Sequence, residues 1–377
     1  MLPTVTFRGL ADPAAFDAGV PHHEFERLRS EDPVSWVPEA DGPGYWAVTR
    51  HADVVAVSAD PVTFSSWAGG TDIDDPGPAA LALVRHLLVN IDPPAHQRLR
   101  LAVEGAFGPE ALARLRARLA AAAAEAVNQA AYGNRFDVAG VTAHLPIVAL
   151  AEVLGVPEAD RWLLGEWADQ IVGGGADPGS ARAAMAELFA YADDLRTWPD
   201  LSGDERRLFL LQLLVGGVEP SHGLMTGIAL ALVETPGAHA RLRADPSLVA
   251  GAVEEAVRWI SPVLHHRRTA TVGAGIGGQA VAAGDKVVLW YASANRDSAV
   301  FARPDRFDPG RDPNPHLGFG HGIHACLGAA LARQVARAVT ASLVAAAPRL
   351  ELDGPIQRAP GPLHNRLTSL PIRLAGI

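Results

Sequence analysis

The sequence predicts a mainly α-helical fold with a small β portion (α+β), built as one domain that spans residues 1–377. Before about residue 260, helix-period segments separated by short Pro/Gly breaks dominate, among them "PEALARLRARLAAAAAEAV" and "SLVAGAVEEAVRWI". After it, "RRTATVGAGIGGQAVAAGDKVVLWY" carries short β-branched runs broken by glycine, which is typical of strands and hairpins. No internal repeat or linker interrupts this order, so one domain is expected.

The composition indicates a protein of the cell interior. The 377 residues are 49% hydrophobic, enough for a large core, and the single cysteine excludes an internal disulfide. The N-terminal stretch has no basic segment followed by an apolar run, and the most apolar segment, "LFLLQLLVGG", is shorter than a membrane span. A net charge of -10 argues against a nucleic-acid surface. We therefore expect a soluble, cytoplasmic protein that binds neither nucleic acid nor membranes.

The C-terminal part combines a long irregular segment with a helix and a strand. Residues 294–322 are dense in Pro, Gly, Asp and Asn, which predicts a long functional loop. Helical periodicity returns over 327–344, and the last residues are typical of a terminal strand. The motif "GAGIGG" (273–278) matches a dinucleotide-binding pattern, but strand-like residues follow it where a helix should begin, so it predicts a hairpin turn.

Cys326, the only cysteine, lies between a glycine-rich loop and the start of a helix. It could be an inert buried thiol, but that role does not need a position where backbone N–H groups and the helix dipole stabilise a thiolate. It could join His321 and His324 around a metal, although structural zinc sites usually bring paired cysteines. The third interpretation is an axial thiolate for haem iron, with the glycines letting the backbone pass close to a flat macrocycle.

The third interpretation agrees with a resemblance. The loop is similar, position for position, to the haem-binding signature of the cytochrome P450 family at Phe319, Gly320, Gly322, His324, Cys326 and Gly328. The resemblance extends over nearly the whole chain. It implies the cytochrome P450 fold, a triangular helical domain that encloses haem b, with Cys326 as the iron ligand and dioxygen bound on the opposite face.

Basic residues for the haem propionates are found at separate places in the sequence. Two carboxylates in a buried site need cations or strong donors aimed at them. His96 and Arg100 are spaced i,i+4 and therefore share a helix face, and they resemble the propionate pair of the family. Arg268 and His324 resemble two further propionate donors. Each of the four could instead be an ordinary surface side chain.

A structural ion-pair network is also expected. Glu255 and Arg258 are spaced i,i+3 on one predicted helix, and Arg306 in the following loop can offer a planar fork to the same carboxylate. Together the three resemble the Glu-Arg-Arg network of the family, which fixes the cysteine loop against the helix. Their role is structural.

The central helix departs from the family at one position. "LFLLQLLVGGVEPSHGLMTGIALALVE" resembles the helix that passes over the iron, with Gly216 and Glu219 at the expected places but Pro220 where a threonine is usual. A helix-interior proline removes a hydrogen bond and costs about 3 kcal/mol. We expect Glu219, Ser221, an ordered water or a substrate hydroxyl to replace the threonine in proton delivery. The alternative is that Pro220 only kinks the helix and Ser221 faces away.

Other expectations concern the periphery. Only the short segment "PDLSGDERR" precedes the central helix, so a small helix present in relatives should be missing or reduced. Substrate contacts are expected from residues 67–88, from the segment after Ile260 and from the turn near His364. An electron donor would approach the sulfur side, where a basic patch is expected from Arg98, Arg333 and Arg337.

The resemblance implies a haem-thiolate monooxygenase that oxidises a small organic substrate with dioxygen. The expected reaction is C–H hydroxylation in a biosynthetic tailoring step, with electrons from a ferredoxin and a ferredoxin reductase. Because Pro220 replaces the threonine, one alternative is oxidative coupling or ring closure of an aromatic or peptide-like substrate. Another alternative, outside the enzyme class, is a haem-based ligand sensor.

Overall fold

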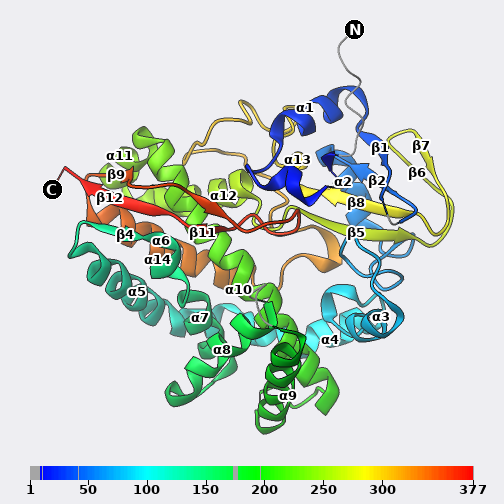
Figure 1. Ribbon diagram of the computed structural model, residues 1–377, viewed down its shortest axis with the longest axis horizontal. Coiled ribbons are helices and arrows are strands. Elements are labelled where there is room, and N and C mark those ends of the chain that lie inside the picture. Colours follow the sequence, from blue (N-terminus) through cyan, green and yellow to red (C-terminus); the bar gives the residue numbers. More distant parts are fainter. Residues whose placement is uncertain (1–8, 11, 41, 173–176, 196, 377) are drawn as a thin grey trace.

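A computed structural model describes residues 9–376 apart from 11, 41, 173–176 and 196. Helices gather on one side of the molecule, and the largest sheet lies on the other (Figure 1). The helices are α1 (His22–Glu31), α2 (His51–Ala59), α3 (Pro78–Val84), α4 (Ala95–Val103), α5 (Pro109–Ala131), α6 (Val138–Thr142), α7 (Leu145–Leu154), α8 (Arg161–Val172), α9 (Pro178–Asp194), α10 (Gly203–Glu234), α11 (Pro236–Ala244), α12 (Val249–Ile260), α13 (Tyr291–Ala294) and α14 (Ala329–Ala346). The predicted mainly α-helical class with a small β portion is confirmed.

The strands form small sheets. They are β1 (Val34–Val37), β2 (Tyr45–Val48), β3 (Phe64–Ser65), β4 (Arg135–Asp137), β5 (His265–Ala270), β6 (Ala274–Ile276), β7 (Gln279–Val281), β8 (Lys286–Trp290), β9 (Arg349–Leu352), β10 (Gln357–Arg358), β11 (Leu367–Ser369) and β12 (Pro371–Ala375). The largest sheet has the order β1-β2-β8-β5-β3, and β12 pairs with β4 and β9. The predicted terminal strand is therefore present.

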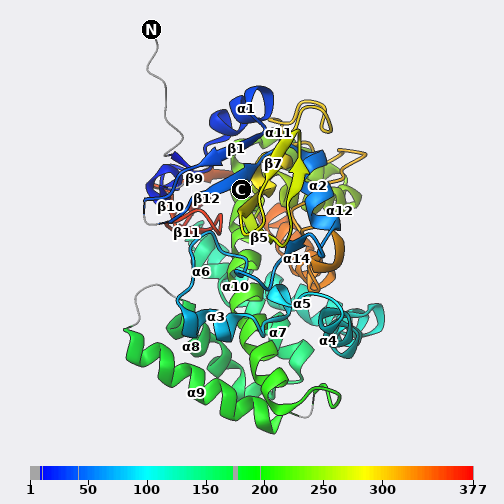
Figure 2. The same cartoon turned by 90° about the vertical axis from the view of Figure 1, so that its right-hand side faces the viewer.

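Helix α10 is the centre of the helical side. It begins with a capping box in which Ser202 and Glu205 satisfy each other's free backbone N–H groups. It is long and apolar enough to span a membrane by composition, but it packs against α7, α9, α12 and α14 within the protein. Pro220 lies inside the helix, which continues on both sides of it. Figure 2 shows α10 running through the molecule with α9 beside it.

Two local predictions are confirmed by the backbone. Residues 273–278 do not open a helix, because β6 and β7 form a hairpin whose turn places Gly277 and Gly278 at φ values of 57° and 88°. In the described part of the chain no helix lies between α9 and α10, as the short connecting segment predicts. The region that usually carries this helix is thus reduced to a loop.

Candidate functional site

The cysteine loop is shaped by glycine. Gly320 and Gly322 both adopt φ of 71°, and a side chain at Gly322 would overlap the backbone of Ser58. The N–H of Cys326 donates to the carbonyl of Phe319 at 2.8 Å, which closes the loop just before α14 begins. The glycines therefore allow a tight turn of the backbone, which places the Cys326 thiol just before the start of α14.

The thiol of Cys326 combines solvent access with a position deep in the protein. Its side chain is solvent accessible, yet burial is the largest influence on its pKa, which it raises. The Gly328 backbone and the charges of Arg100 and Arg333 act in the opposite direction and favour the thiolate. Within the described residues, no three His, Cys, Asp or Glu side chains are placed to hold a metal ion, so the cluster with His321 and His324 is not formed.

Arg100 reaches the same loop from α4. Its Nη1 donates to the carbonyl of Ile323 at 3.1 Å and to that of Ala325 at 2.8 Å. The predicted propionate donor thus also holds the backbone directly before Cys326. A hydrogen-bonded guanidinium at this place fixes the loop and adds positive charge beside the sulfur.

Several basic side chains converge beside this loop. The rings of His96 and His324 lie 4.6 Å apart, and the Nδ1 atom of each is buried without a partner among the described residues. Buried Arg268 donates to the carbonyl of Arg267. Burial, together with Arg268 and the other cations nearby, lowers the pKa of His324 to about 2, and burial lowers that of His96 to about 4. Asp92 interacts electrostatically with His96 and Arg268, but its oxygens accept hydrogen bonds from residues 65–67. Among the described residues, no carboxylate forms an ion pair with this cluster.

Sequence reasoning missed a fifth member of the basic cluster, His266. It lies two residues before Arg268 on β5, so both side chains project from the same face of the strand. Burial, followed by the charge of Arg268, lowers the pKa of His266 well below its usual value, and its ring contacts Tyr291. Strand alternation counted back from Arg268 could have found it.

The ion-pair network contains a different arginine from the one predicted. Glu255 and Arg258 are fully buried and form a two-pronged pair at 2.8 Å, as the sequence indicates. The third partner is Arg311, whose Nε lies 2.9 Å from Glu255 Oε2. The prediction of Arg306 is wrong, because that residue contributes its backbone carbonyl while its side chain is exposed. The loop folds back on itself, which places residue 311 over the carboxylate.

Helix α10 offers open space beside two glycines and a carboxylate held by two ion pairs. A side chain added at Gly216 or Gly217 would meet nothing within 4 Å, although both lie in the middle of the central helix. Two residues further, Glu219 forms ion pairs with His364 and Arg366, each at 3.2 Å. Burial tends to raise the pKa of Glu219, but the hydrogen bond from His364 and the charge of Arg366 outweigh it and lower the pKa.

The predicted basic patch for an electron donor is largely neutralised. Arg98 forms an ion pair with Glu205 on α10. Arg333 pairs with Glu254 at 2.8 Å and lies over the ring of Phe319, so it supports the cysteine loop. Arg337 is exposed. Arg337 alone of the three remains available in the described structure.

The predicted substrate segments meet in part. His364 forms a bridge with Val263, and the N–H of Leu264 donates to the carbonyl of Leu363, so the segment after Ile260 and the turn near His364 lie side by side. In the segment 67–88, the guanidinium of Arg85 lies 3.9 Å from the centre of the Trp67 ring. The structure therefore joins the second and third of the predicted segments directly.

Comparison with known proteins identifies the family. The cytochrome P450 family model matches residues 200–346. The chain is 36% identical over 399 residues to linalool 8-monooxygenase of Pseudomonas putida, a match that covers 97% of this chain and 98% of that protein. The chain belongs to the cytochrome P450 family. A further P450 relative is the methyl-branched lipid omega-hydroxylase of Mycobacterium bovis, 37% identical over 87% of this chain and 85% of that protein.

Solved P450 structures agree in fold. A cytochrome P450 of Mycobacterium marinum in complex with pseudoionone superposes with a TM-score of 0.86 at 32% identity, covering 96% of this chain and 97% of that one. A cytochrome P450 of Novosphingobium aromaticivorans superposes with a TM-score of 0.87 at 30% identity, covering 99% and 98%. The protein is accordingly a P450 oxidoreductase with haem b as its cofactor, and the enzyme interpretation displaces the ligand sensor.

The residues of this P450 suit haem b. Haem needs a ligand for its iron, flat protein surfaces against its macrocycle and partners for its two propionates. Cys326 is a free, solvent-accessible cysteine, and glycines 216 and 328 leave open space in front of their Cα atoms. In the basic cluster, the Nδ1 atoms of His96 and His324 have no partner among the described residues, and no carboxylate there forms an ion pair with the cluster. The described residues therefore include an iron ligand, space for the macrocycle and donors for the propionates.

Proposed function

We propose that this protein is a haem-thiolate monooxygenase that hydroxylates a C–H bond of a small, largely aliphatic substrate. The observation that carries the proposal is the solvent-accessible thiol of Cys326, just before the first residue of α14 and near the charge of Arg100. When bound there, the haem supplies the activation of dioxygen. Cys326 would hold the haem iron as a thiolate ligand.

The remaining site residues have defined roles in this proposal. His96, Arg100, Arg268 and His324 bind the propionates through charge-assisted hydrogen bonds. Phe319, Gly320, Gly328 and Gly216 border the macrocycle, and the missing side chains of the glycines let it lie close to the backbone. Glu219 acts on the dioxygen side as an acid–base group, because it is the ionisable residue at the helix position that Pro220 interrupts.

The names of relatives suggest the substrate class. One is a monooxygenase of linalool, another a hydroxylase of methyl-branched lipids, and a solved neighbour holds pseudoionone. All three molecules are branched, mostly apolar chains. We propose a substrate of this kind, oxidised in a biosynthetic tailoring step by a soluble, cytoplasmic enzyme that receives electrons from a ferredoxin and its reductase.

The proposal is tested by spectral titration followed by turnover. Branched aliphatic alcohols, ketones and fatty acids are added to the ferric protein, and a true substrate should shift the Soret band as iron-bound water is displaced. With a ferredoxin, its reductase and a reduced nicotinamide, that compound should yield a product with one added oxygen. A product with a new bond between two substrate carbons and no added oxygen would replace hydroxylation by oxidative coupling.

Ser221 provides a test of the acid–base assignment. Its hydroxyl has no hydrogen-bond partner among the described residues, whereas Glu219 is held by two. We expect Ser221→Ala to keep the ratio of product formed to reductant consumed within about two-fold of the wild type, and Glu219→Gln to lower it by about ten-fold or more. A large loss of coupling in Ser221→Ala, with Glu219→Gln unaffected, would transfer the role to the serine.

A further inference from the structure

The turn that carries His364 is fixed by the segment that follows α12. The N–H of Asn365 donates to the carbonyl of Pro262 at 3.0 Å, and its side-chain amide donates to that of Ile260 at 2.6 Å. Together with the bridge between Val263 and His364, these bonds hold the turn at several points. A side chain on a turn that is held in this way is already positioned, so it loses little conformational entropy when it takes part in binding or catalysis.

The same turn lies directly against α10. A side chain at Gly223 would come within 2.6 Å of the Asn365 carbonyl, so only glycine lets the two backbones approach this closely. Gly223 follows Glu219 by four residues, which is about one helical turn. The contact therefore places the residues on either side of Asn365 next to the Glu219 carboxylate.

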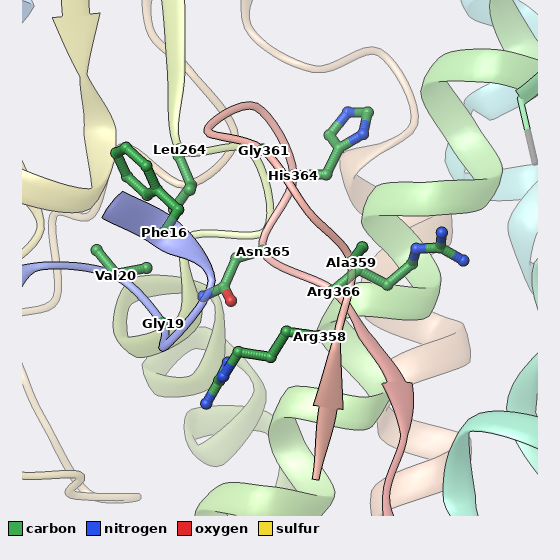
Figure 3. A pocket seen from close by; sticks show the side chains of 10 residues that line it. All are labelled: Phe16, Gly19, Val20, Leu264, Arg358, Ala359, Gly361, His364, Asn365 and Arg366. Atoms are coloured by element: carbon green, nitrogen blue, oxygen red, sulfur yellow. The ribbon is translucent and has the colours of Figure 1, made fainter. Parts of the chain in front are cut away.

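His364 and Arg366 hold that carboxylate with one contact to each oxygen. Nδ1 of His364 lies 3.2 Å from Oε2 of Glu219, and Nη2 of Arg366 lies 3.2 Å from Oε1. Figure 3 shows both side chains extending from the turn towards α10, while Arg358 extends in the opposite direction. The guanidinium of Arg358 lies beside Gly19 instead.

A proton path needs a group that gains and loses a proton, and a second group that stabilises the charged form of the first. Here the two roles fall on different residues. Glu219 has a lowered pKa, so it stays a carboxylate at neutral pH and cannot by itself store a proton. Pro220 contributes neither an N–H group nor a hydroxyl. Imidazole is the side chain that normally gains and loses a proton near neutral pH, and Nε2 of His364 has no partner in the described part of the chain.

We propose that His364 is the proton carrier of the dioxygen side of this site and that Glu219 anchors its charged form. The inference rests on the proposed monooxygenase function. Hydroxylation converts R–H and dioxygen to R–OH and water, and it consumes two protons and two electrons. The electrons come from the redox proteins. Each proton is taken up from water at Nε2 of His364 and released through Nδ1 to Oε2 of Glu219, which passes it to the pocket and returns to the carboxylate. Exchange of the ring protons with water then restores the Nδ1–H tautomer of His364 for the second proton.

The charges around His364 come from several elements. Glu219 on α10 and Asp72 in the segment before α3 favour the imidazolium, and Arg366 opposes it. His265 and His266 on β5 are also coupled to His364. Burial lowers the pKa of His265 to about 4 and lowers that of His266 well below its usual value, so both are neutral at neutral pH. The two carboxylates thus outnumber the single fixed cation.

The test uses the haem-loaded ferrous protein with carbon monoxide, whose C–O stretching frequency responds to nearby charge. In the wild type we expect this band to shift with pH through one midpoint. His364→Gln should abolish the shift. Glu219→Gln should keep the shift but move its midpoint down by about one pH unit or more, because the anchoring charge is gone.

Turnover supplies the second measurement. In His364→Gln the ratio of product to reductant should fall by about ten-fold, with hydrogen peroxide released in place of product. In the wild type that ratio should fall as the pH rises through the midpoint, since the charged carrier is lost. Arg358→Gln, on the same hairpin but with its side chain extending in the opposite direction to His364 and Arg366, is the matched control and should resemble the wild type in both measurements.

The outcomes distinguish the two proposals. A C–O band that does not move with pH in the wild type, or that moves equally in His364→Gln, overturns the role of His364. If His364→Gln does not fold, an unchanged midpoint in Glu219→Gln overturns it equally. A carbonyl complex without the red-shifted Soret band of thiolate-ligated haem would instead refute the proposed function itself.

Discussion

Replacing Cys326 by serine should remove the red-shifted Soret band of the ferrous carbonyl complex and reduce product formation by about 100-fold or more. Changes around a metal ligand already cost about 10- to 100-fold in activity, and here the ligand itself is lost. Haem should still bind, because the basic cluster around His96 and His324 is untouched. The measurement is an absorbance spectrum with carbon monoxide, together with the haem content of the purified variant.

The control for this variant lies in the same loop. His321 is exposed, and His321→Ala should keep the thiolate band and the activity. Retention of the band in Cys326→Ser would mean that sulfur does not ligate the iron, and the proposed function would fail with it.

Replacing Arg258 by lysine should lower the free energy of unfolding by about 3–5 kcal/mol, the cost of breaking a buried ion pair. The guanidinium is fully buried, and all five of its N–H donors have acceptors on Glu255, Asn295, Pro304 and Arg306. Lysine has three donors and a different shape, so buried carbonyls and part of the carboxylate lose their partners. Denaturant unfolding of the haem-loaded protein measures the change.

Substitutions at Arg311 and Arg306 test which of these two arginines is the third member of the ion-pair network. Arg311→Lys should also destabilise the protein, by about 1–3 kcal/mol, because Nε of Arg311 contacts both oxygens of Glu255. Arg306→Lys should change the free energy of unfolding by less than about 0.5 kcal/mol, since its side chain is exposed. If Arg306→Lys lowered the free energy of unfolding more than Arg311→Lys, Arg306 would be the third member of the network.

The residues that the sequence identified best belong to short, contiguous motifs. The glycine spacing around Cys326, the i,i+3 pair of Glu255 and Arg258, and the Gly-Gly turn after β6 all act within a few residues of one another. Local backbone rules decide such features: a positive φ needs glycine, and residues three or four apart share a helix face. The same rules predicted the helical class and the missing helix before α10.

The partners across the fold could not be predicted in this way. Arginines 303, 306 and 311 lie in one irregular loop, and only the path of that loop selects Arg311 for Glu255. His364 is 145 residues from Glu219 in the sequence, and the two meet because the C-terminal turn packs against α10 at Gly223. No periodic pattern links positions so far apart.

The sequence by itself determined the helical class, the cysteine loop and the proline in the central helix, because each depends on neighbouring residues and on backbone geometry. Only the tertiary structure decided which charges meet: Arg311 on Glu255, His266 beside Arg268, and His364 with Arg366 on Glu219. Buried charges need partners, but the chain can supply them from any segment that packing brings close. The identity of those partners is therefore a property of the folded chain.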